Sequence, residues 1–142
     1  MRQLSATDAR EMAVIHAQSF ERSWDALEMA THTQRDLCLG ADHKGALAGF
    51  IIVSTPADQA EILTLATAKT ARRQGLARLL LNETTNQLRQ NGVKEVFLEV
   101  AEDNLGALAL YKYAGFQPIG RRPGYYRREG GRVAAMTFSK KV

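Results

Sequence analysis

The chain has 142 residues, of which 45% are hydrophobic and 24% are charged, the composition of an ordinary folded domain. Its net charge of +4 at pH 7 favours an anionic partner, either a nucleic acid or a phosphorylated small molecule. No apolar run approaches the roughly 20 residues of a membrane-spanning helix, and the N-terminus lacks the layout of a signal peptide. We therefore expect one domain over residues 1–142 in the cytoplasm, with no membrane partner.

Cysteine and histidine are too sparse for a structural cross-link or a recognisable metal motif. Cys38 is the only cysteine, which excludes an intramolecular disulfide, and the three histidines are scattered along the first third of the chain. His16 is interpreted as a surface or packed residue rather than a ligand. We expect no metal.

Two helices are predicted in the first 36 residues, after a short strand at residues 1–4. Ser5 or Thr7 caps the first helix, in which Met12, Ile15 and Ser19 share one face. The second helix begins at Ser23 and ends before Asp36. Its side chains available for packing are Leu27 and Met29.

The rest of the chain predicts a hairpin, then a β-α-β-α run and a final hairpin. Periodicity and turn residues define the elements. The strands are residues 37–40, 47–53, 61–67, 96–100, 117–128 and 132–138, and the helices run from about Gln74 to Asn91 and from a cap at Asp103 or Asn104 to Gly115.

Residues 71–77, Ala-Arg-Arg-Gln-Gly-Leu-Ala, place positive charge directly before a predicted helix. A helix N-terminus presents unpaired backbone N–H groups and the positive end of the helix dipole, so it can bind phosphate. Gly75 lets the backbone approach an anion, and Arg72 and Arg73 supply charge. A solvated basic turn is the alternative. The helix residues expected to face the core are Leu76, Leu79 and Leu80.

This stretch resembles the coenzyme loop of the GNAT superfamily of N-acetyltransferases. It matches the signature Arg/Gln-x-x-Gly-x-Gly/Ala, with Ala77 in place of the commoner second glycine. The resemblance implies that the loop and the helix start hold the pyrophosphate of acetyl-coenzyme A (acetyl-CoA) through backbone N–H groups. It also implies a mixed α/β (α+β) fold. In that fold a mainly antiparallel central sheet has helices on both faces and one parallel pair that splays where the coenzyme enters.

Glu99 interrupts the apolar strand at residues 96–100. Strand alternation places its side chain opposite Val96, Leu98 and Val100. A carboxylate in such a strand is costly unless it faces water or a polar site. An exposed strand face and a cleft-lining position are both compatible with this pattern.

A second motif agrees with the first in order and spacing. Residues 104–111, Asn-Leu-Gly-Ala-Leu-Ala-Leu-Tyr, followed by Gly115-Phe116, resemble the family pattern Asn-x-x-Ala-x-x-Leu-Tyr…Gly-Phe. The match extends over residues from about 61 to 126. It is similar there to the RimI-type branch, the ribosomal-protein alanine N-acetyltransferases, through Leu98-Glu99-Val100, Arg121-Arg122 and Tyr125-Tyr126.

The resemblance to this branch implies roles for individual residues. Glu99 takes the position of the general base and Tyr111 that of the general acid. Such roles fit the chemistry, because an α-amine must lose protons to attack a thioester and a phenol can protonate the leaving thiolate. The implied coenzyme contacts are Leu65, Ala66, Thr67, Arg72, Arg73, Gln74, Gly75, Leu76, Ala77 and Asn104. Backbone N–H groups near Leu65 and Ala66 would stabilise the oxyanion of direct transfer, which needs no cysteine nucleophile.

Three aromatic residues are candidates for acceptor binding: Trp24, Tyr125 and Tyr126. Ser23-Trp24 resembles the branch's Pro-Trp-Ser region, although Arg22-Ser23 supplies no proline. Packing in the core is the alternative for each aromatic residue. Five arginines lie close to the two tyrosines in the sequence: Arg121, Arg122, Arg127, Arg128 and Arg132. Ribosomal RNA, acidic groups of a peptide and solvent are the alternative contacts for this basic cluster.

The function expected from these observations is acetyl transfer from acetyl-CoA to the α-amine of an N-terminal alanine, in a small-subunit ribosomal protein. One alternative acceptor is a lysine, a polyamine or another small amine. Another alternative is a non-catalytic acyl-CoA sensor, which would need neither Glu99 nor Tyr111. An RNA-binding module is the third, but the chain lacks the interleaved aromatic pattern of single-strand binding. No direct nucleic-acid binding is required, and the oligomeric state is left open.

Overall fold

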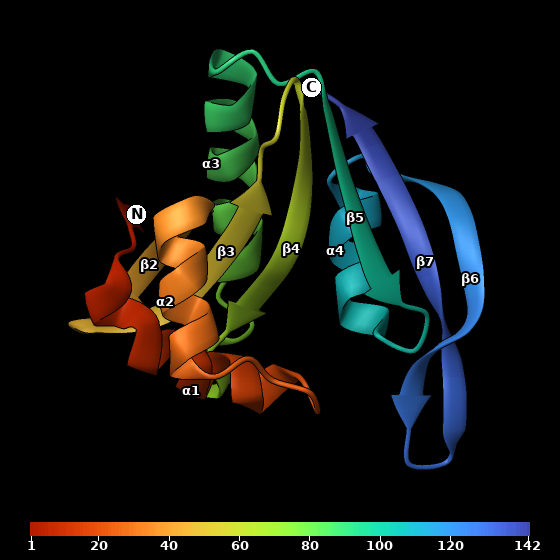
Figure 1. Cartoon of the computed structure of the whole chain (residues 1–142), viewed down its shortest axis with the longest axis horizontal. Coiled ribbons are helices and arrows are strands. Elements are labelled where there is room, and N and C mark those ends of the chain that lie inside the picture. The colour runs from red at the N-terminus through yellow and green to blue at the C-terminus, as the bar shows by residue number, and fades with distance from the viewer.

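The computed structural model describes all residues, 1–142, as a seven-stranded sheet with helices on both of its faces (Figure 1). The strands are β1 (Arg2–Gln3), β2 (Leu37–His43), β3 (Ala46–Ser54), β4 (Gln59–Thr67), β5 (Glu95–Ala101), β6 (Gln117–Arg128) and β7 (Gly131–Lys141). The helices are α1 (Ala9–Ser19), α2 (Ala26–Arg35), α3 (Leu76–Gln90) and α4 (Leu105–Tyr113), with single 3₁₀ turns at Ala6–Asp8 and Lys69–Ala71.

The strand order is β1-β2-β3-β4-β5-β7-β6. Every neighbouring pair is antiparallel except β4 and β5, which run parallel and are connected through α3. The mixed, mainly antiparallel sheet predicted from the sequence is therefore confirmed. None of the helices is long and apolar enough to cross a membrane.

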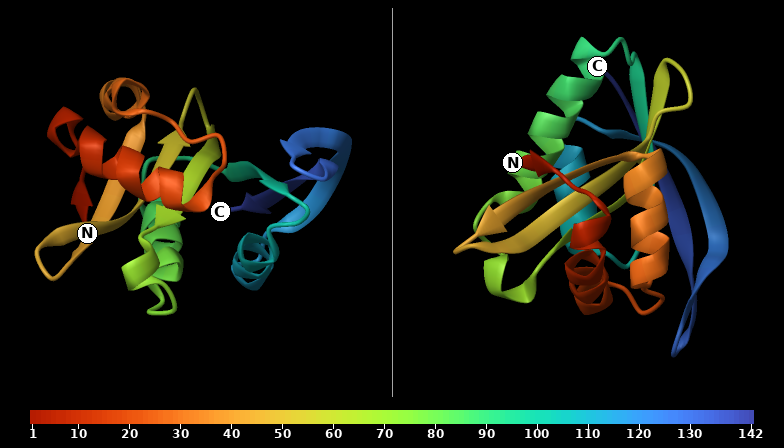
Figure 2. Two further views of the ribbon diagram at one scale, coloured as in Figure 1. Left: turned by 90° about the horizontal axis from the view of Figure 1, so that it is seen from below. Right: turned by 60° about the vertical axis from the view of Figure 1, so that its left-hand side comes forward.

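The sheet separates two hydrophobic cores (Figure 2, left). Helices α1 and α2 cover one face, where Met12, Met29 and Phe50 are fully buried. Helices α3 and α4 cover the other face, where Leu80 and Phe138 are fully buried. Each helix buries one apolar stripe against the sheet, and this burial is the main stabilising contribution to the fold.

Strand β4 changes the direction of its side chains at a bulge. The register between β3 and β4 skips one residue, Leu63. Ile62 and Leu65 consequently both face the core under α3, whereas Leu63 and Ala66 face α1 and α2. The parallel pairing of β4 with β5 ends at Ile62, beside the bulge. Beyond this point the two strands separate (Figure 1), and residues 63–67 have a strand neighbour on one side only.

Predicted element boundaries agree with the structure to within a few residues, but two packing predictions are wrong. Leu27 on α2 is 77% exposed and Leu79 on α3 is 49% exposed. Helix α2 begins later than predicted because Asp25 and Glu28 form a capping box, with N–H to carboxylate distances of 2.8 and 3.2 Å. In α3 the buried position expected of Leu79 belongs to Leu81.

Candidate functional site

A cleft opens between α3 and α4, where β4 and β5 separate. It has two adjoining parts of about 520 and 450 Å³. The outer part lies between the N-terminus of α3 and the outer surface of α4. The inner part reaches the end of α1, so the cleft draws its walls from both faces of the sheet. The residues common to both parts are Thr67, Arg72, Ala77, Gly106 and Leu110.

The loop before α3 presents a row of backbone N–H groups to the outer cleft. No backbone acceptor pairs with the N–H groups of residues 73–78. Arg73 and Gly75 both adopt left-handed backbone conformations, with φ of 65° and 76°, and Gly75 is the N-cap of α3. A Cβ atom at Gly75 would meet nothing within 4 Å, so the backbone there is open to a ligand. Free N–H groups at the positive end of a helix suit a phosphate group.

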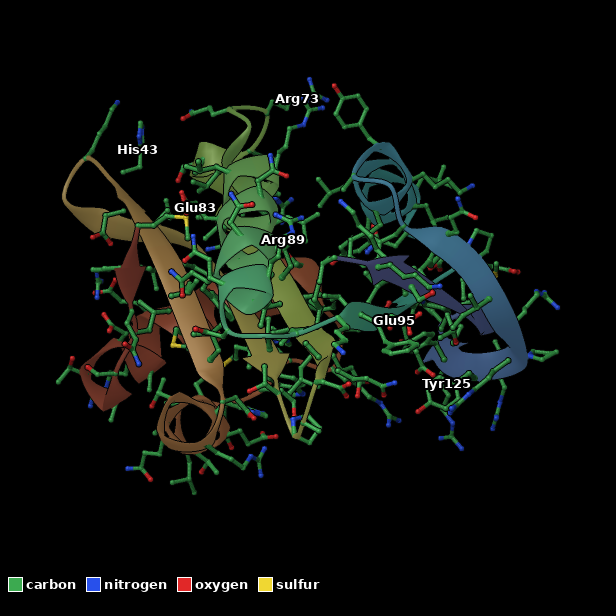
Figure 3. The ribbon with its side chains drawn as sticks, turned by 90° about the horizontal axis from the view of Figure 1, so that it is seen from above. His43, Arg73, Glu83, Arg89, Glu95 and Tyr125 are labelled. Atoms are coloured by element: carbon green, nitrogen blue, oxygen red, sulfur yellow. The ribbon has the colours of Figure 1, made fainter.

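The two loop arginines have different surroundings. Arg72 donates to Ser19 Oγ (2.9 Å) and to the Gln18 carbonyl (3.3 Å), so it joins the loop to the end of α1. Arg73 makes no such contact and lies at the edge of the molecule between α3 and α4 (Figure 3). Only Arg73 is therefore free to meet an anion in the outer cleft without giving up a protein contact.

Across the outer cleft, a cation–π contact links α3 to α4. The Arg78 guanidinium lies 4.0 Å from the centre of the Tyr113 ring, and both residues line the outer part. The pair presents a planar cationic and aromatic surface at the mouth of the cleft.

Tyr111 closes the inner cleft. Its ring is buried and packs edge-to-face on Phe116, with 5.7 Å between centroids. Burial raises the pKa of the phenol above its ordinary value, so the hydroxyl keeps its proton at any physiological pH. The inner cleft also contains residues 65–67 of β4 and Asn104, whose side chain caps α4 by accepting from the Ala107 N–H at 3.2 Å.

Glu99 lies across the sheet from Tyr111 rather than beside it. Alternation along β5 directs Glu99 away from the core that contains Tyr111, as the sequence predicts, and Glu99 does not line either part of the cleft. It is the first residue of β5 beyond the pairing with β4, so it stands where the two strands separate. Its side chain is 24% exposed, and its carboxylate lies 3.3 Å from the Arg122 guanidinium on β6.

The three acceptor-binding candidates lie outside the cleft, in two groups. Trp24 is half-buried between the rings of His16 and His32, at centroid distances of 4.9 and 4.7 Å. Tyr125 and Tyr126 pack edge-to-face on β6, with 5.1 Å between centroids, and Tyr125 is 51% exposed (Figure 3). Burial, and then the charge of nearby Glu99, raise the pKa of Tyr126.

Comparison with known proteins decides the family. The sequence model of the acetyltransferase (GNAT) family matches residues 4–116. The chain belongs to this family. The [ribosomal protein bS18]-alanine N-acetyltransferase of Escherichia coli K12 is 31% identical to this GNAT protein over 137 residues, which cover 96% of the chain and 93% of the relative. N-alpha-acetyltransferase RimI of Mycobacterium tuberculosis is 34% identical over 141 residues, covering 94% of the chain and 87% of the relative.

A solved structure gives the same result for the fold. The crystal structure of the ribosomal-protein-S18-alanine N-acetyltransferase from E. coli is similar to this GNAT fold with a TM-score of 0.94 and 29% identity. The similarity covers 99% of this chain and 92% of that chain. The resemblance found in the sequence is confirmed, and the chain is an acetyl-CoA-dependent N-acetyltransferase.

Several residues of the GNAT cleft are absent from the sequence-based site. They are Gln18, Ser19, Phe20, Ala71, Arg78, Gly106, Ala107, Ala109, Leu110 and Tyr113. The cleft residues at the end of α1 could not be predicted from their sequence neighbours, because they reach the cleft only through the packing of α1 against β4 near its bulge. The helical spacing from Asn104 to Tyr111 could have indicated Gly106 and Leu110, which lie on the same helix. No group of three or more metal-ligating side chains gathers anywhere in the chain.

Proposed function

We propose that this acetyltransferase moves an acetyl group from acetyl-CoA directly to the α-amine of an N-terminal alanine, in a small-subunit ribosomal protein. One observation carries the proposal: the cleft leads from the free N–H groups of residues 73–78 to Tyr111, next to the point where β4 and β5 separate at Glu99. Two relatives that are similar over nearly the whole chain support the acceptor: the name of the E. coli protein gives an alanine of a ribosomal protein, and that of the M. tuberculosis protein gives an α-amine. A ribosomal-protein acceptor implies a cytoplasmic reaction.

The residues of the cleft fit acetyl-CoA. We assign the pyrophosphate to the N–H groups of residues 73–78, with Arg73 as the free cation and Gly75 as the point of closest backbone approach. Leu76 and Ala77 form the adjoining wall, Gln74 completes the loop, and Arg72 holds the loop on α1. The remainder of the coenzyme would run along residues 65–67 of β4 toward Asn104.

The proposed reaction uses two side chains and one strand edge. Glu99 accepts a proton from the α-ammonium, directly or through water, and the neutral amine nitrogen bonds to the acetyl carbonyl carbon. The backbone N–H of Leu65, which points to the open edge of β4, stabilises the oxyanion. The carbon–sulfur bond then breaks, Tyr111 gives its proton to the leaving thiolate, and the nitrogen, now part of the amide, loses its extra proton to water. Glu99 and Tyr111 approach this centre from opposite faces of the sheet.

Direct transfer is supported by the position of the only cysteine. Cys38 is 1% exposed in the core under α1 and α2, and burial, with a smaller contribution from Asp36, raises the pKa of its thiol to about 12. A thiol in this state is a poor nucleophile. It also does not line the cleft, so an acyl-cysteine intermediate has no support here.

The acceptor peptide would lie on the side of Glu99, between the α1–α2 connection and the β6–β7 hairpin. Trp24 from the first of these and Tyr125 and Tyr126 from the second are the proposed contacts. Their aromatic rings offer apolar surface together with polar atoms at their edges, which suits a peptide whose backbone must be held in place.

The experiment is release of free thiol from acetyl-CoA, measured over peptides of one length that differ at the first residue. The proposal predicts the highest kcat/KM for alanine-first peptides, a loss with bulky first residues, and no transfer when the α-amine is blocked. Faster transfer to polyamines would favour a small-amine acceptor. Binding of acetyl-CoA with no transfer to any amine would favour the sensor alternative.

A further inference from the structure

A stack of four aromatic rings runs from the surface of α2 to the inner cleft. The centroid distances along it are 4.7 Å from His32 to Trp24, 4.9 Å from Trp24 to His16, and 4.4 Å from His16 to Phe20. Phe20 lines the inner cleft, and His32 at the other end pairs with Asp36 at 2.7 Å. The stack therefore connects the cleft wall to a helix that does not itself reach the cleft.

His16 is the member of the stack that is fixed by hydrogen bonds at both ring nitrogens. The Trp24 backbone N–H donates to Nδ1 at 3.1 Å, which leaves Nε2 as the protonated nitrogen, 3.1 Å from Thr64 Oγ1. The ring is 3% exposed. Burial, with a smaller contribution from His32, lowers the pKa of His16 to about 4, so the ring is neutral at neutral pH.

Few other hydrogen bonds hold the segment of residues 20–25, which connects α1 to α2. Its backbone N–H groups donate only at Phe20, to the His16 carbonyl, at Trp24, to the His16 ring, and at Asp25, to the first turn of α2. Of these three bonds, the one from Trp24 ends on the His16 side chain, and the one from Phe20 is the last backbone bond of α1. His16 also joins the segment to β4 through its hydrogen bond to Thr64. Thr64 lies between the bulge residue Leu63 and the cleft residue Leu65.

The segment lies at the same end of the molecule as the tip of the β6–β7 hairpin (Figures 1 and 2). The pKa of Arg128 on β6 is raised chiefly by its hydrogen bonds to Asp103, and in smaller part by the charge of Glu21 in the segment. A peptide that reaches Glu99 passes between these two walls, and only the hairpin wall is built from paired strands.

We propose that His16 is a positioning residue for the acceptor. By joining residues 20–25 to Thr64 on β4, it fixes Phe20 and Trp24 as one wall of the acceptor path, without touching the acceptor itself. This inference rests on the proposed function, because it assumes that an amine-bearing peptide enters on this side.

The kinetic experiment compares His16→Phe, which keeps an aromatic ring in the stack but removes both hydrogen bonds, with Thr64→Val, which removes only the bond to β4. We expect the KM of the alanine-first peptide to rise about tenfold in His16→Phe and about threefold in Thr64→Val. These factors correspond to the loss of two hydrogen bonds and of one hydrogen bond. Acetyl-CoA affinity and kcat should change less than about twofold. The amide of His16→Gln can both donate and accept, so it should restore part of the KM.

Ile15→Val is the matched control, since Ile15 is buried on the same helix and in the same core but is not one of the four stacked rings and makes none of the hydrogen bonds to them. It should lower the thermal midpoint without changing the peptide KM. Equal changes in peptide KM and acetyl-CoA affinity in His16→Phe would overturn the proposal, as would a lowered thermal midpoint with unchanged peptide KM.

Trp24 is the only tryptophan, so its fluorescence reports on the segment independently of activity. In His16→Phe, acrylamide quenching of Trp24 and hydrogen exchange at its amide should both increase relative to wild type and Ile15→Val. Unchanged quenching and exchange would overturn the role of His16 in fixing the segment. If wild type acetylates no α-amine, the proposed function fails, and the fluorescence result still judges whether His16 fixes the segment.

Discussion

The Arg122 guanidinium lies 3.3 Å from the Glu99 carboxylate (Nη2 to Oε1), in an ion pair that includes no hydrogen bond of good geometry. It belongs to a row of three pairs that join the end of β5 and the turn after it to β6. Each of the other two pairs is held by two hydrogen bonds; they are Arg121 with Glu102 and Arg128 with Asp103. Glu99 thus has the most easily displaced of the three arginine partners.

Replacing Arg122 with methionine should lower the KM of the acceptor peptide about two- to fivefold, with kcat little changed. An acceptor α-ammonium must compete with the guanidinium for Glu99, and an exposed pair of this kind is worth at most about 1 kcal/mol. Steady-state kinetics at low salt provides the measurement. Arg121→Met, which breaks a pair of similar exposure away from Glu99, is the control and should leave KM unchanged. A raised KM in Arg122→Met alone would show that the arginine helps to bind the acceptor.

Glu99→Gln and Tyr111→Phe should each lower kcat by about 10²–10⁴, because each keeps the shape of the side chain and removes a proton-transfer group. Acetyl-CoA affinity measured by calorimetry should stay within about twofold of wild type, since the pyrophosphate site lies at α3. Wild-type turnover across the pH profile in both variants would show that the acid and base roles belong to other groups.

Substitutions at Gly75 should weaken acetyl-CoA binding, and the opposite end of α3 provides a matched control. Gly75 and Gly92 both have positive φ, 76° and 86°, and a Cβ at either would meet nothing within 4 Å. Alanine at either position should therefore cost a similar free energy of unfolding, roughly 1 kcal/mol. Only Gly75→Ala should reduce the affinity for acetyl-CoA in calorimetry, and Gly75→Glu should reduce it further through its charge. Equal affinities in all three variants would remove the loop from the coenzyme site.

His16 should make the protein less stable as the pH falls from about 6.5 toward 4. Its pKa in the folded chain is about 4, below the ordinary value of 6.5, so the unfolded chain binds more protons between these pH values. The free energy of unfolding consequently decreases with falling pH, by at most about 1.4 kcal/mol per pH unit from this group. Urea unfolding at pH 7, 6 and 5 should show a steeper decrease for wild type than for His16→Gln. Parallel decreases would mean that the His16 pKa is not lowered.

The sequence predicted those parts of the fold and site that depend on neighbouring residues. Three features depend only on residues within about two helical turns or one strand. They are the loop from Arg72 to Ala77, the cap at Asn104 and the sheet face on which the Glu99 side chain lies. For that reason their local pattern was sufficient. Leu79 is exposed because the buried face of α3 includes two threonines, Thr84 and Thr85, beside Leu80, Leu81 and Leu88, and Leu79 points away from that face.

Features that join distant parts of the chain could not be predicted in this way. His16 and Thr64 are 48 residues apart, and their contact depends on the bulge at Leu63, which directs Thr64 toward α1. No residue type or spacing marks that bulge in a single sequence. The pairing of Arg122 with Glu99 likewise requires β7 to lie between β5 and β6 in the sheet order, which only the three-dimensional structure shows.

The most direct test of the account is one peptide that offers both kinds of amine, with alanine first and a lysine in its interior. The enzyme and acetyl-CoA act on it to partial conversion near neutral pH, and tandem mass spectrometry locates the acetyl group. An α-amine with a pKa of about 8 is easier for Glu99 to deprotonate than a lysine amine at about 10.4. We expect acetyl on the alanine α-amine, with the lysine unmodified. Acetyl mainly on the lysine side chain would contradict it.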